Sequence, residues 1–327
     1  MTESSFTRPF ASASTTSSER GNALSSEPEL HVVGWRKQRT LAKPIELTGR
    51  GLLYGRRVRL RLLPAEADTG RVFVRTDRSI PAVIPAIADA VTATDRRTVL
   101  GTPPVHVELV EHVLAALAGM MVDNCRIELD GPEPPGWDGS VRPLVHALKE
   151  VGFSAQRADL PIVTVRTTLE VCLNSSRIVF LPSTASTCLE IDYFLDYGTW
   201  SVIAPQRFSC RATPQDFLNA LAASRTFLLL EEVQALRHQG LGIHTGPEHV
   251  LVFTQRGVLG NRLRWADEAV RHKILDLIGD LALIGWPLAG RLVAYRSGHR
   301  LNVHLAQQIR RAGRTTRLGH LLSASAA

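Results

Sequence analysis

Three side chains that can bind a metal ion or move a proton recur at helical spacing near residue 276. His272, Asp276 and Asp280 stand at positions i, i+4 and i+8, so a helix would place them in a stripe along one face. An imidazole and a carboxylate one turn apart can share a metal ion. The same spacing is common in ordinary surface hydrogen bonds, so the stripe alone leaves both interpretations open.

An apolar segment in the first half of the chain carries a histidine at the corresponding position. Setting residues 110–119 over 270–279 matches Val, His, Leu and Gly at the same offsets and aligns His112 with His272. Apolar helices share valines and leucines by chance, so the match is modest support for an internal repeat. The paired histidines are its most informative part, because a histidine on an apolar face is costly to bury without a partner.

Together, His112, His272 and Asp276 would form a set of two imidazoles and one carboxylate. Such a set leaves a fourth tetrahedral position for water, the pattern of a catalytic zinc site. Glu111 precedes His112 and could take a proton from that water, while Gly279 would let the two helices approach closely. The same donors suit non-haem iron oxygenases, so the ligands alone do not choose the reaction.

A further histidine follows a predicted strand that ends at Tyr295, in the tripeptide Ser-Gly-His that ends at His299. A histidine on a turn is usually only a solvated polar residue. If the turn folds back toward the metal, His299 could protonate a leaving group, and Asp280 could hold it as imidazolium.

The elements that must position these side chains follow from the hydrophobic periodicity. Residues 57–62 alternate Arg with Val or Leu, which predicts a half-buried strand with its arginines on the solvated face. Further strands are predicted at 72–75, 125–129, 162–166, 178–181, 189–193 and 291–295, and helices at 107–121, 214–224 and 265–283. Sheet and helix alternate in both halves, which predicts the α+β class with two domains joined near residue 155.

Composition and cysteine usage restrict the class of protein. The 327 residues are 44% hydrophobic, enough to bury the cores of two domains. The four cysteines are widely spaced without a Cys-x-x-Cys pair, which excludes a disulfide framework and a thiolate metal site and fits a reducing cytoplasm. No run of 18 apolar residues and no apolar signal-peptide core occur, so we expect a cytoplasmic protein without a membrane span.

The two ends of the chain differ from the middle in composition. Residues 1–36 are rich in Ser, Thr and Ala and are predicted to be a disordered extension. Residues 306–327 are predicted to be a basic, solvated tail, which leaves 37–155 and 156–305 as the two domains. Lys and Arg total 38 against 31 Asp and Glu. Four of the seven excess charges lie in the tail, so a nucleic-acid partner is not expected. These four are Arg310, Arg311, Arg314 and Arg317.

Several segments, read together, resemble the zinc-dependent UDP-3-O-acyl-N-acetylglucosamine deacetylases of lipid A biosynthesis in Gram-negative envelopes. The resemblance covers about residues 38–305. The segments that carry it are 38–41 (QRTL), 64–77 (PAEADTGRVFVRTD), 110–119 (VEHVLAALAG), 122–124 (VDN), 138–140 (DGS), 224–227 (SRTF), 270–281 (VRHKILDLIGDL) and 297–299 (SGH). A lone Glu-His pair would be weak, whereas these motifs in family order across two domains are specific.

The resemblance implies a fold, a ligand set and a role for each matching residue. The expected fold is a two-domain sandwich of β-α-α-β units, with the helix layers packed together and the active site between the domains. His112, His272 and Asp276 resemble the zinc ligands, Glu111 the general base and His299 the general acid. The remaining matches are Thr226 for oxyanion stabilisation, Phe227 for the substrate wall, Lys273 for a substrate-binding cation and Asp280 for the carboxylate that orients His299.

The implied reaction is metal-assisted hydrolysis of an acetamide, with zinc as the cofactor and acetate as the leaving product. The implied partner is a small molecule of the UDP-acyl-N-acetylglucosamine type, and the protein is expected to be a cytoplasmic monomer. With this context, the iron oxygenase and the surface hydrogen bond become the weaker interpretations of the His272 and Asp276 pair.

Three departures from the family pattern lie in regions expected to face substrate. Leu53 and Tyr54 stand where the family has His-Thr, residues 244–248 (HTGPE) replace a Gly-Gly-Ser-x-Asp stretch, and residues 193–197 (YFLDY) lack a His-Pro turn. Three functions remain open on this basis: the deacetylase itself, a related zinc amidase for another N-acetylated sugar, and a non-catalytic binding protein. The last would be expected to have lost a catalytic residue, and none is lost.

Overall fold

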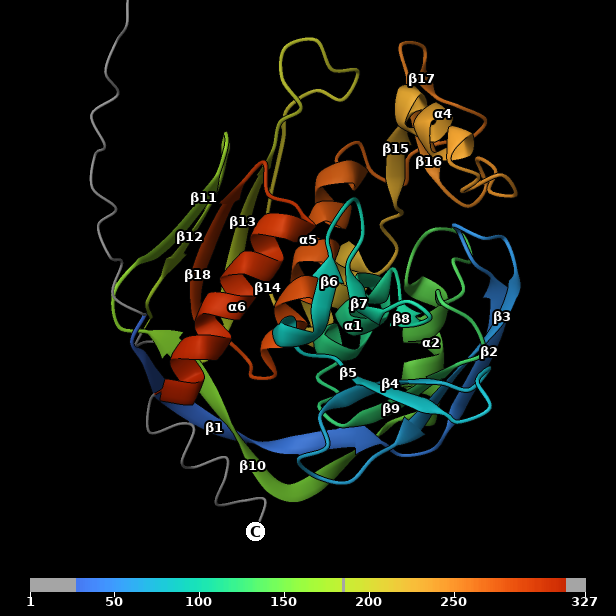
Figure 1. Cartoon of the computed structure of the whole chain (residues 1–327). Coiled ribbons are helices and arrows are strands. Elements are labelled where there is room, and N and C mark those ends of the chain that lie inside the picture. Colours follow the sequence, from blue (N-terminus) through green and yellow to red (C-terminus); the bar gives the residue numbers. More distant parts are fainter. Residues whose placement is uncertain (1–27, 184–185, 316–327) are drawn as a thin grey trace, which may run out of the picture.

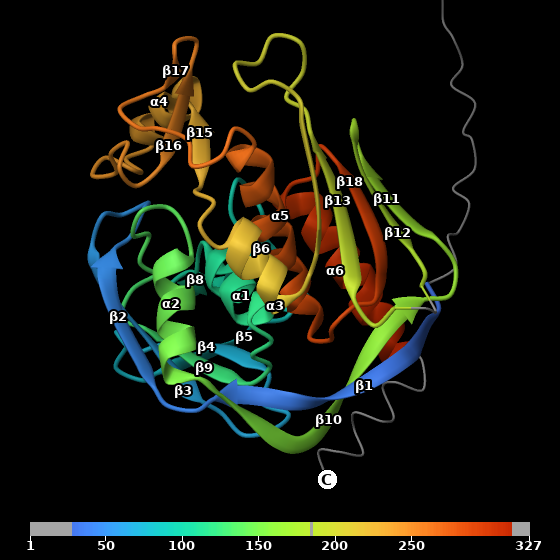
Figure 2. The ribbon, with the colours of Figure 1, turned by 180° about the vertical axis from the view of Figure 1, so that it is seen from behind.

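The computed structural model describes residues 28–183 and 186–315, which form two α+β halves joined by one long pair of strands (Figure 1). The pair consists of β1 (Leu30–Leu41) and β10 (Phe153–Val165), which run antiparallel. Figure 2 shows both strands passing beneath the two halves. The predicted domain boundary at residue 155 therefore falls inside a strand that both halves share.

The first half is built on a five-stranded sheet. Its strands lie in the order β2 (Ile45–Arg50), β3 (Arg57–Pro64), β9 (Cys125–Leu129), β4 (Arg71–Arg75) and β5 (Ala82–Pro85). Neighbours are antiparallel except β4 and β9, which are parallel. The alternation predicted for β3 is confirmed, because Val58, Leu60 and Leu62 are buried while Arg57 and Arg59 are exposed. The helices of this half are α1 (Val110–Gly119) and α2 (Arg142–Val151).

The second half repeats this plan. Its strands lie in the order β11 (Leu169–Leu173), β12 (Ser176–Leu181), β18 (Gly290–Tyr295), β13 (Leu189–Leu195) and β14 (Gln206–Arg211). The parallel pair is β13 and β18, at the same place in the strand order as in the first sheet. Its main helices are α5 (Glu268–Leu281) and α6 (His299–Thr315). The repeat suggested by the paired histidines thus extends to the whole of each half.

The helices of the two halves face each other between the sheets, with α1 packed directly on α5 (Figures 1 and 2). A Cβ atom at Gly279 would lie 2.0 Å from the carbonyl oxygen of Glu111, so only glycine permits this approach. The arrangement confirms the predicted α+β sandwich of two domains with helix layers in contact.

Each half also has a small group of additional elements that lies outside its five-stranded sheet, near this helix interface. In the first half they are β6 (Val91–Ala93), β7 (Val99–Thr102) and β8 (Val105–Val107). In the second half they are β15 (Phe227–Leu229), α4 (Leu230–His238), β16 (Leu251–Thr254) and β17 (Gly257–Val258). The helix predicted over 214–224 is shorter, as α3 (Pro214–Asp216) continues into a π-helical turn at Phe217–Leu221.

The structure corrects the predicted boundary at the N-terminal end. Residues 30–36 belong to β1, where Leu30 is buried opposite Val165, so they are not part of a disordered extension. Composition missed this strand because its partner lies far along the chain. Residues 1–27 lie outside the described residues.

The predicted tail also begins too early. Residues 306–315 continue α6, and Arg310 and Arg314 both contact Asp89 of the first half, at 3.1 and 2.7 Å. These charges are therefore not simply solvated, since a carboxylate distant in sequence meets them. Arg317 lies outside the described residues. Among the described helices, none has the length and apolar character needed to cross a bilayer.

Candidate active site

The three residues selected as metal ligands meet where α1 and α5 pack together. His112 lies in the first turns of α1, and His272 and Asp276 lie one turn apart on α5. One ligand atom of each residue lies within 4.8 Å of the others. His272 and Asp276 are buried and His112 is partly exposed, so the set faces solvent from one side only.

One oxygen of Asp276 carries the strongest indication that a cation belongs here. Asp276 Oδ1 lies 3.3 Å from His272 Nε2 and 3.6 Å from His112 Nε2. It is buried and has no hydrogen-bond partner among the described residues. A buried carboxylate oxygen without a partner is costly. The donor set therefore fits a metal ion, which would satisfy this oxygen and both imidazoles at once.

Neighbouring charge and burial keep Asp276 and His272 in the forms that bind metal. Asp276 Oδ2 accepts a hydrogen bond from Lys273 Nζ at 2.7 Å. Burial opposes ionisation of Asp276, but Lys273 and His272 hold its pKa well below the usual range. Burial lowers the pKa of His272 to about 4, against the pull of Asp276. A carboxylate and a neutral imidazole are the ligand forms of these side chains.

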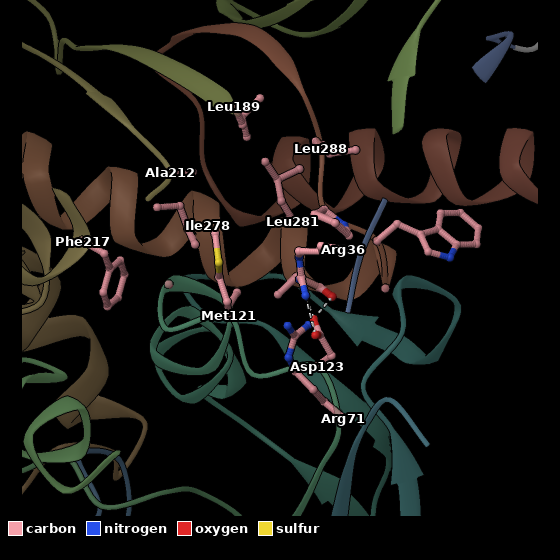
Figure 3. A pocket seen from close by; sticks show the side chains of 16 residues that line it. Arg36, Arg71, Met121, Asp123, Leu189, Ala212, Phe217, Ile278, Leu281 and Leu288 are labelled. Carbon is pink, nitrogen blue, oxygen red and sulfur yellow. Dashed lines mark hydrogen bonds and ion pairs between the residues drawn. The ribbon is translucent and has the colours of Figure 1, made fainter. Parts of the chain in front are cut away.

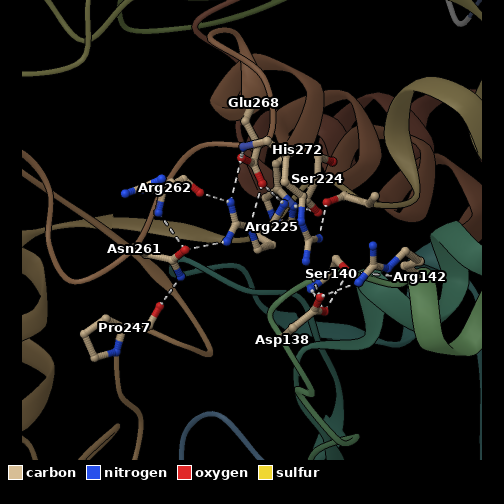
Figure 4. A network of polar contacts seen from close by, with 12 residues as sticks. Asp138, Ser140, Arg142, Ser224, Arg225, Pro247, Asn261, Arg262, Glu268 and His272 are labelled. Carbon is tan, nitrogen blue, oxygen red and sulfur yellow. Dashed lines mark hydrogen bonds and ion pairs between the residues drawn. The ribbon is translucent and has the colours of Figure 1, made fainter.

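The tautomer of His272 is set by a backbone carbonyl. His272 Nδ1 faces Ser224 O at 3.2 Å, so its proton sits on Nδ1 and Nε2 is free to bind a metal. Ser224 is followed by Arg225, which binds Glu268 through Nε and Nη2 at 2.7 and 3.0 Å (Figure 4). Glu268 is fully buried in the first turn of α5. This ion pair fixes the loop that presents the Ser224 carbonyl.

A second contact ties the same loop to the first half of the molecule. Arg264 donates to Asp138 Oδ2 at 2.5 Å and to Ala223 O at 2.6 Å. Next to Asp138, the Gly139 carbonyl accepts the Thr226 N–H at 2.8 Å. A Cβ at Gly139, whose φ is +83°, would lie 2.2 Å from the carbonyl oxygen of His249 and 3.4 Å from the Thr226 side chain, so this position requires glycine. The motifs at 138–140 and 224–227 therefore act as one structural unit.

Glu111 lies beside His112, and within the described residues only one of its two oxygens accepts a hydrogen bond. Its Oε2 accepts the Thr98 N–H at 3.0 Å, and the residue lines the cavity described below. Burial raises its pKa above the usual value, although the charges of His299 and His112 act in the opposite sense. A carboxyl group with a raised pKa is suited to taking up a proton.

His299 begins α6 rather than lying on a solvated turn, and it is 8% exposed. Its Nδ1 lies 3.0 Å from Asp280 Oδ2, which also accepts Asn302 Nδ2 at 2.9 Å. Burial opposes its charge, but Asp280 and Glu111 raise the pKa of His299 to about 9. The imidazolium form therefore prevails at neutral pH, and its Nε2 points away from Asp280 as a proton donor.

These side chains open into a cavity of about 350 Å³. Thr226 and Phe227 form part of its wall, and the Phe227 ring meets His272 edge to face at 6.3 Å between centroids. The cationic side chains in the lining, besides the histidines, are Arg96, Lys273, Arg296 and Arg300. Asp280 lies behind His299 and does not line the cavity. The polar half of an anionic substrate fits such a lining.

A second, mainly apolar cavity of about 170 Å³ shares Arg96, Leu109, Thr226 and Leu228 with the first. Leu53 and Thr245 line it, and Thr245 Oγ1 donates to the Leu52 carbonyl at 2.6 Å. His244 is exposed and does not line it. The expectation that the segment 244–248 faces the substrate is therefore wrong for His244.

The segment 193–197 contributes to the site in two ways. The fully buried Tyr193 donates its hydroxyl to the carbonyl of Ser297, next to the loop that leads to His299. Tyr197 lines the larger cavity and meets Phe227 edge to face. Tyr54, another departure, donates to Glu108 Oε1 at 2.6 Å and is partly exposed.

Sequence reasoning missed two residues that hydrogen-bond the carboxylates of Glu111 and Asp280. Asn302 lies three residues after His299, so helical spacing would reveal it once α6 is known. Thr98 donates its hydroxyl to Asp280 Oδ1 at 2.6 Å, across 182 residues of sequence. No periodic pattern connects positions so far apart, and only the folded chain shows the contact.

Comparison with known families gives a match over most of the chain. The family described as LpxC, UDP-3-O-acyl N-acetylglycosamine deacetylase, matches residues 38–311. This range contains every candidate site residue discussed above.

Individual relatives agree with the family match. A UDP-3-O-acyl-N-acetylglucosamine deacetylase of Myxococcus xanthus is 40% identical over 273 residues, covering 83% of this chain and 86% of the relative. Proteins of the same name from Thermosynechococcus vestitus and a Nostoc species are 40% and 38% identical, covering 93% and 98% of those relatives and 83% and 84% of this chain. The similarity thus spans both halves and nearly the full length of the relatives.

Proposed function

The chain belongs to the UDP-3-O-acyl-N-acetylglucosamine deacetylase family, and from that premise we propose how its residues perform the reaction. The enzyme hydrolyses the acetamide of UDP-3-O-acyl-N-acetylglucosamine and releases acetate, a step in lipid A biosynthesis. We propose the identity of the cofactor, the role of each residue and the position in which the substrate binds.

We propose that His112, His272 and Asp276 hold a catalytic zinc ion. The observation that carries this proposal is the buried Asp276 Oδ1, which has no hydrogen bond and faces both imidazole Nε2 atoms. Two imidazoles and one carboxylate with an open side suit catalytic zinc. Zinc bound there would supply a Lewis acid that lowers the pKa of water and polarises the acetamide carbonyl.

Glu111 acts as the general base in this proposal. Its Oε2 is restrained by the Thr98 N–H, so Oε1 is the oxygen left to accept a proton from the attacking water. The raised pKa of the buried carboxyl group favours proton uptake. Thr226, at the junction of the two cavities, offers its hydroxyl to the developing oxyanion, where one donor contributes roughly 3 to 4 kcal/mol.

His299 acts as the general acid. Asp280 binds its Nδ1, and the raised pKa keeps the ring protonated, so Nε2 can transfer a proton to the departing sugar amine. The acetamide C–N bond breaks, the water oxygen with its second proton stays on the acetic acid, which ionises to acetate by giving that proton to the solvent, and the amine leaves with the proton from His299. The proton that Glu111 took from water restores the ring for the next turnover.

The two cavities divide the substrate by polarity. We place the diphosphate and sugar in the larger cavity, where Lys273, Arg296 and Arg300 line the wall, because cations and phosphate oxygens attract each other. The acyl chain occupies the apolar cavity beside Leu53. Phe227, on β15 of the second half, forms part of the wall against which the sugar would lie.

We place the reaction in the cytoplasm and expect the enzyme to act as a monomer, because one chain supplies both halves of the site. Nothing in the cavity lining suits a nucleic acid in preference to a sugar nucleotide. The departures at Leu53 and Thr245 favour a changed acyl preference and leave the chemistry of the acetamide intact.

Acetate release from UDP-3-O-acyl-N-acetylglucosamine by purified, zinc-loaded protein tests this function. The same sugar nucleotide without its acyl chain serves as the comparison substrate. We expect efficient release only with the acyl chain present. Zinc-loaded protein that releases acetate from another N-acetylated sugar, but not from this one, would replace the proposal with a related amidase.

A further inference from the structure

Thr98 is a fully buried residue whose three polar groups all reach the catalytic helices. It precedes β7 in the small three-stranded addition of the first half and does not line the substrate cavity. We infer that Thr98 is a positioning residue for deacetylation, which holds the carboxylate of Glu111 and that of Asp280 in a fixed mutual arrangement. This inference rests on the proposed roles of Glu111 and His299.

The backbone of Thr98 secures the start of α1. Its carbonyl accepts the Val110 N–H at 3.4 Å, and its N–H donates to Glu111 Oε2 at 3.0 Å. The residue before the helix, Leu109, has a left-handed φ of 55° and provides no side-chain cap. Thr98 therefore replaces an ordinary N-cap. It also restrains Glu111 so that only Oε1 remains for the attacking water.

The side chain of Thr98 reaches the other half of the molecule. Its Oγ1 donates to Asp280 Oδ1 at 2.6 Å in a fully buried contact. Asp280 Oδ2 is the oxygen bound to His299 and Asn302. With both oxygens occupied, the carboxylate of Asp280 has one orientation, and so has the imidazole that depends on it.

The base and the acid must act on one amide from separate halves of the protein. Glu111 belongs to α1 and Asp280 to α5, and Thr98 is the one residue in the described part of the chain that hydrogen-bonds both carboxylates. A small misplacement of catalytic groups is enough to reduce a rate by about 100-fold. The hydroxyl of Thr98 thus links the position of the acid to that of the base.

Thr98→Val tests the inference, because it keeps the backbone contacts and the volume and removes only the hydroxyl. We expect kcat to fall by about 10- to 100-fold, while KM stays within about threefold of the parent because Thr98 does not line the cavity. Zinc content should be unchanged. Thr98→Ser keeps the hydroxyl and should restore kcat to near the parent value.

Thr40→Val is the matched control. Thr40 is also buried and donates its Oγ1 to a carbonyl, that of Asn124, at 2.7 Å, but it lies on β1 away from the catalytic residues. Its variant should lose stability comparable to that lost by Thr98→Val, yet keep the parent kcat. Equal losses of kcat in the two variants would mean that the effect is only structural.

The coupling to Asp280 is tested by a double-mutant cycle. In an Asp280→Asn background, Thr98→Val should lower kcat by less than it does in the parent, because the two changes break the same contact. Fully additive losses, or a parent-like kcat in Thr98→Val, would overturn the inference. If the valine variant does not fold, Thr98→Ala, which also removes the hydroxyl, replaces it, and an undiminished kcat there would be equally contrary.

Two further variants distinguish an error in the proposed roles of Glu111 and His299 from an error in the positioning role of Thr98. Glu111→Gln and His299→Ala are measured beside the Thr98 variants. If both keep parent turnover, the proposed base and acid are wrong whatever Thr98 does. If both are impaired while Thr98→Val is not, only the positioning role falls.

Discussion

The interface between α1 and α5 has a cavity at each of its two ends, and these cavities differ in size and in the residues that line them. The end that holds the proposed metal ligands, which we call the catalytic end, has a cavity of about 350 Å³ around His112 and Asp276. The other end, where both helices finish, has a cavity of about 110 Å³. Figure 3 shows apolar side chains such as Met121, Ile278 and Leu281 around it. Both cavities lie between the halves, and both contain charged residues.

The ends differ in how their carboxylates are satisfied. At the second cavity, Asp123 binds both Nη atoms of Arg36 at 2.6 and 2.7 Å and accepts the Arg39 N–H at 2.9 Å. Arg71 donates there to backbone carbonyls, those of Val122 and Ala282. At the catalytic end, Asp276 leaves a buried oxygen without a hydrogen bond. The unsatisfied oxygen, and not the presence of a cavity or of charge, distinguishes the end to which we assign the chemistry.

Removing a ligand at the catalytic end should have the largest effect. His272→Ala removes one of the three metal-binding side chains, so zinc content should fall sharply and kcat/KM by more than about 10³-fold. Metal analysis and acetate release measure the two effects. Full zinc content in this variant would place the ion elsewhere.

Glu111→Gln separates the contribution of the proposed base from that of the metal ligands at the catalytic end. The amide keeps the shape of the side chain but cannot take a proton from water, so kcat should fall by about 10²- to 10⁴-fold while zinc stays bound. Steady-state kinetics with parallel metal analysis separate the two. Activity within a few-fold of the parent would assign the base to another residue.

The apolar cavity next to the catalytic end should respond more weakly. Thr245→Gly removes bulk and a hydroxyl that bonds the Leu52 carbonyl, so longer acyl chains should be accepted, with kcat/KM for them rising about tenfold. An acyl-length series measures this preference. His244→Gly is the control, because His244 lies outside the cavity lining. An equal change in acyl preference in both variants would refute the assignment of the acyl chain to this cavity.

Changes at the opposite end should affect stability alone. Asp123→Asn leaves Arg36 without its carboxylate, and the free energy of unfolding should drop by about 1 to 3 kcal/mol. Activity of the folded enzyme should remain within about twofold of the parent value, because Asp123 does not contact the substrate in this account. Urea unfolding and kinetics at low temperature test this. A large fall in kcat without a fall in the free energy of unfolding of Asp123→Asn would show that this end is not purely structural.

The parts predictable from the sequence were those with a local pattern. His272 and Asp276 share a helix face, β3 alternates, and the motif of α1 repeats in α5, so spacing alone indicated each of them. The resemblance to a family then assigned roles to residues on separate elements. None of this required knowledge of contacts between distant segments.

The parts that sequence reasoning missed depend on contacts between distant segments. Arg310 and Arg314 are predicted to be solvated, whereas the structure places Asp89, more than 200 residues earlier in the chain, beside both of them. Leu30 is buried by Val165, and Thr98 contacts Asp280 across the two halves. Local composition carries no information about such partners, because burial and pairing arise only when the chain folds.

Zinc titration of the chelator-treated enzyme tests the central claim most directly. If His112, His272 and Asp276 bind the catalytic ion, acetate release should rise linearly with added zinc and stop rising at about one equivalent per chain. Arg36→Met, altered at the opposite end, should follow the same line, and His272→Ala should stay near zero. Full turnover by enzyme shown to be free of metal, or a parent-like titration by His272→Ala, would contradict the account.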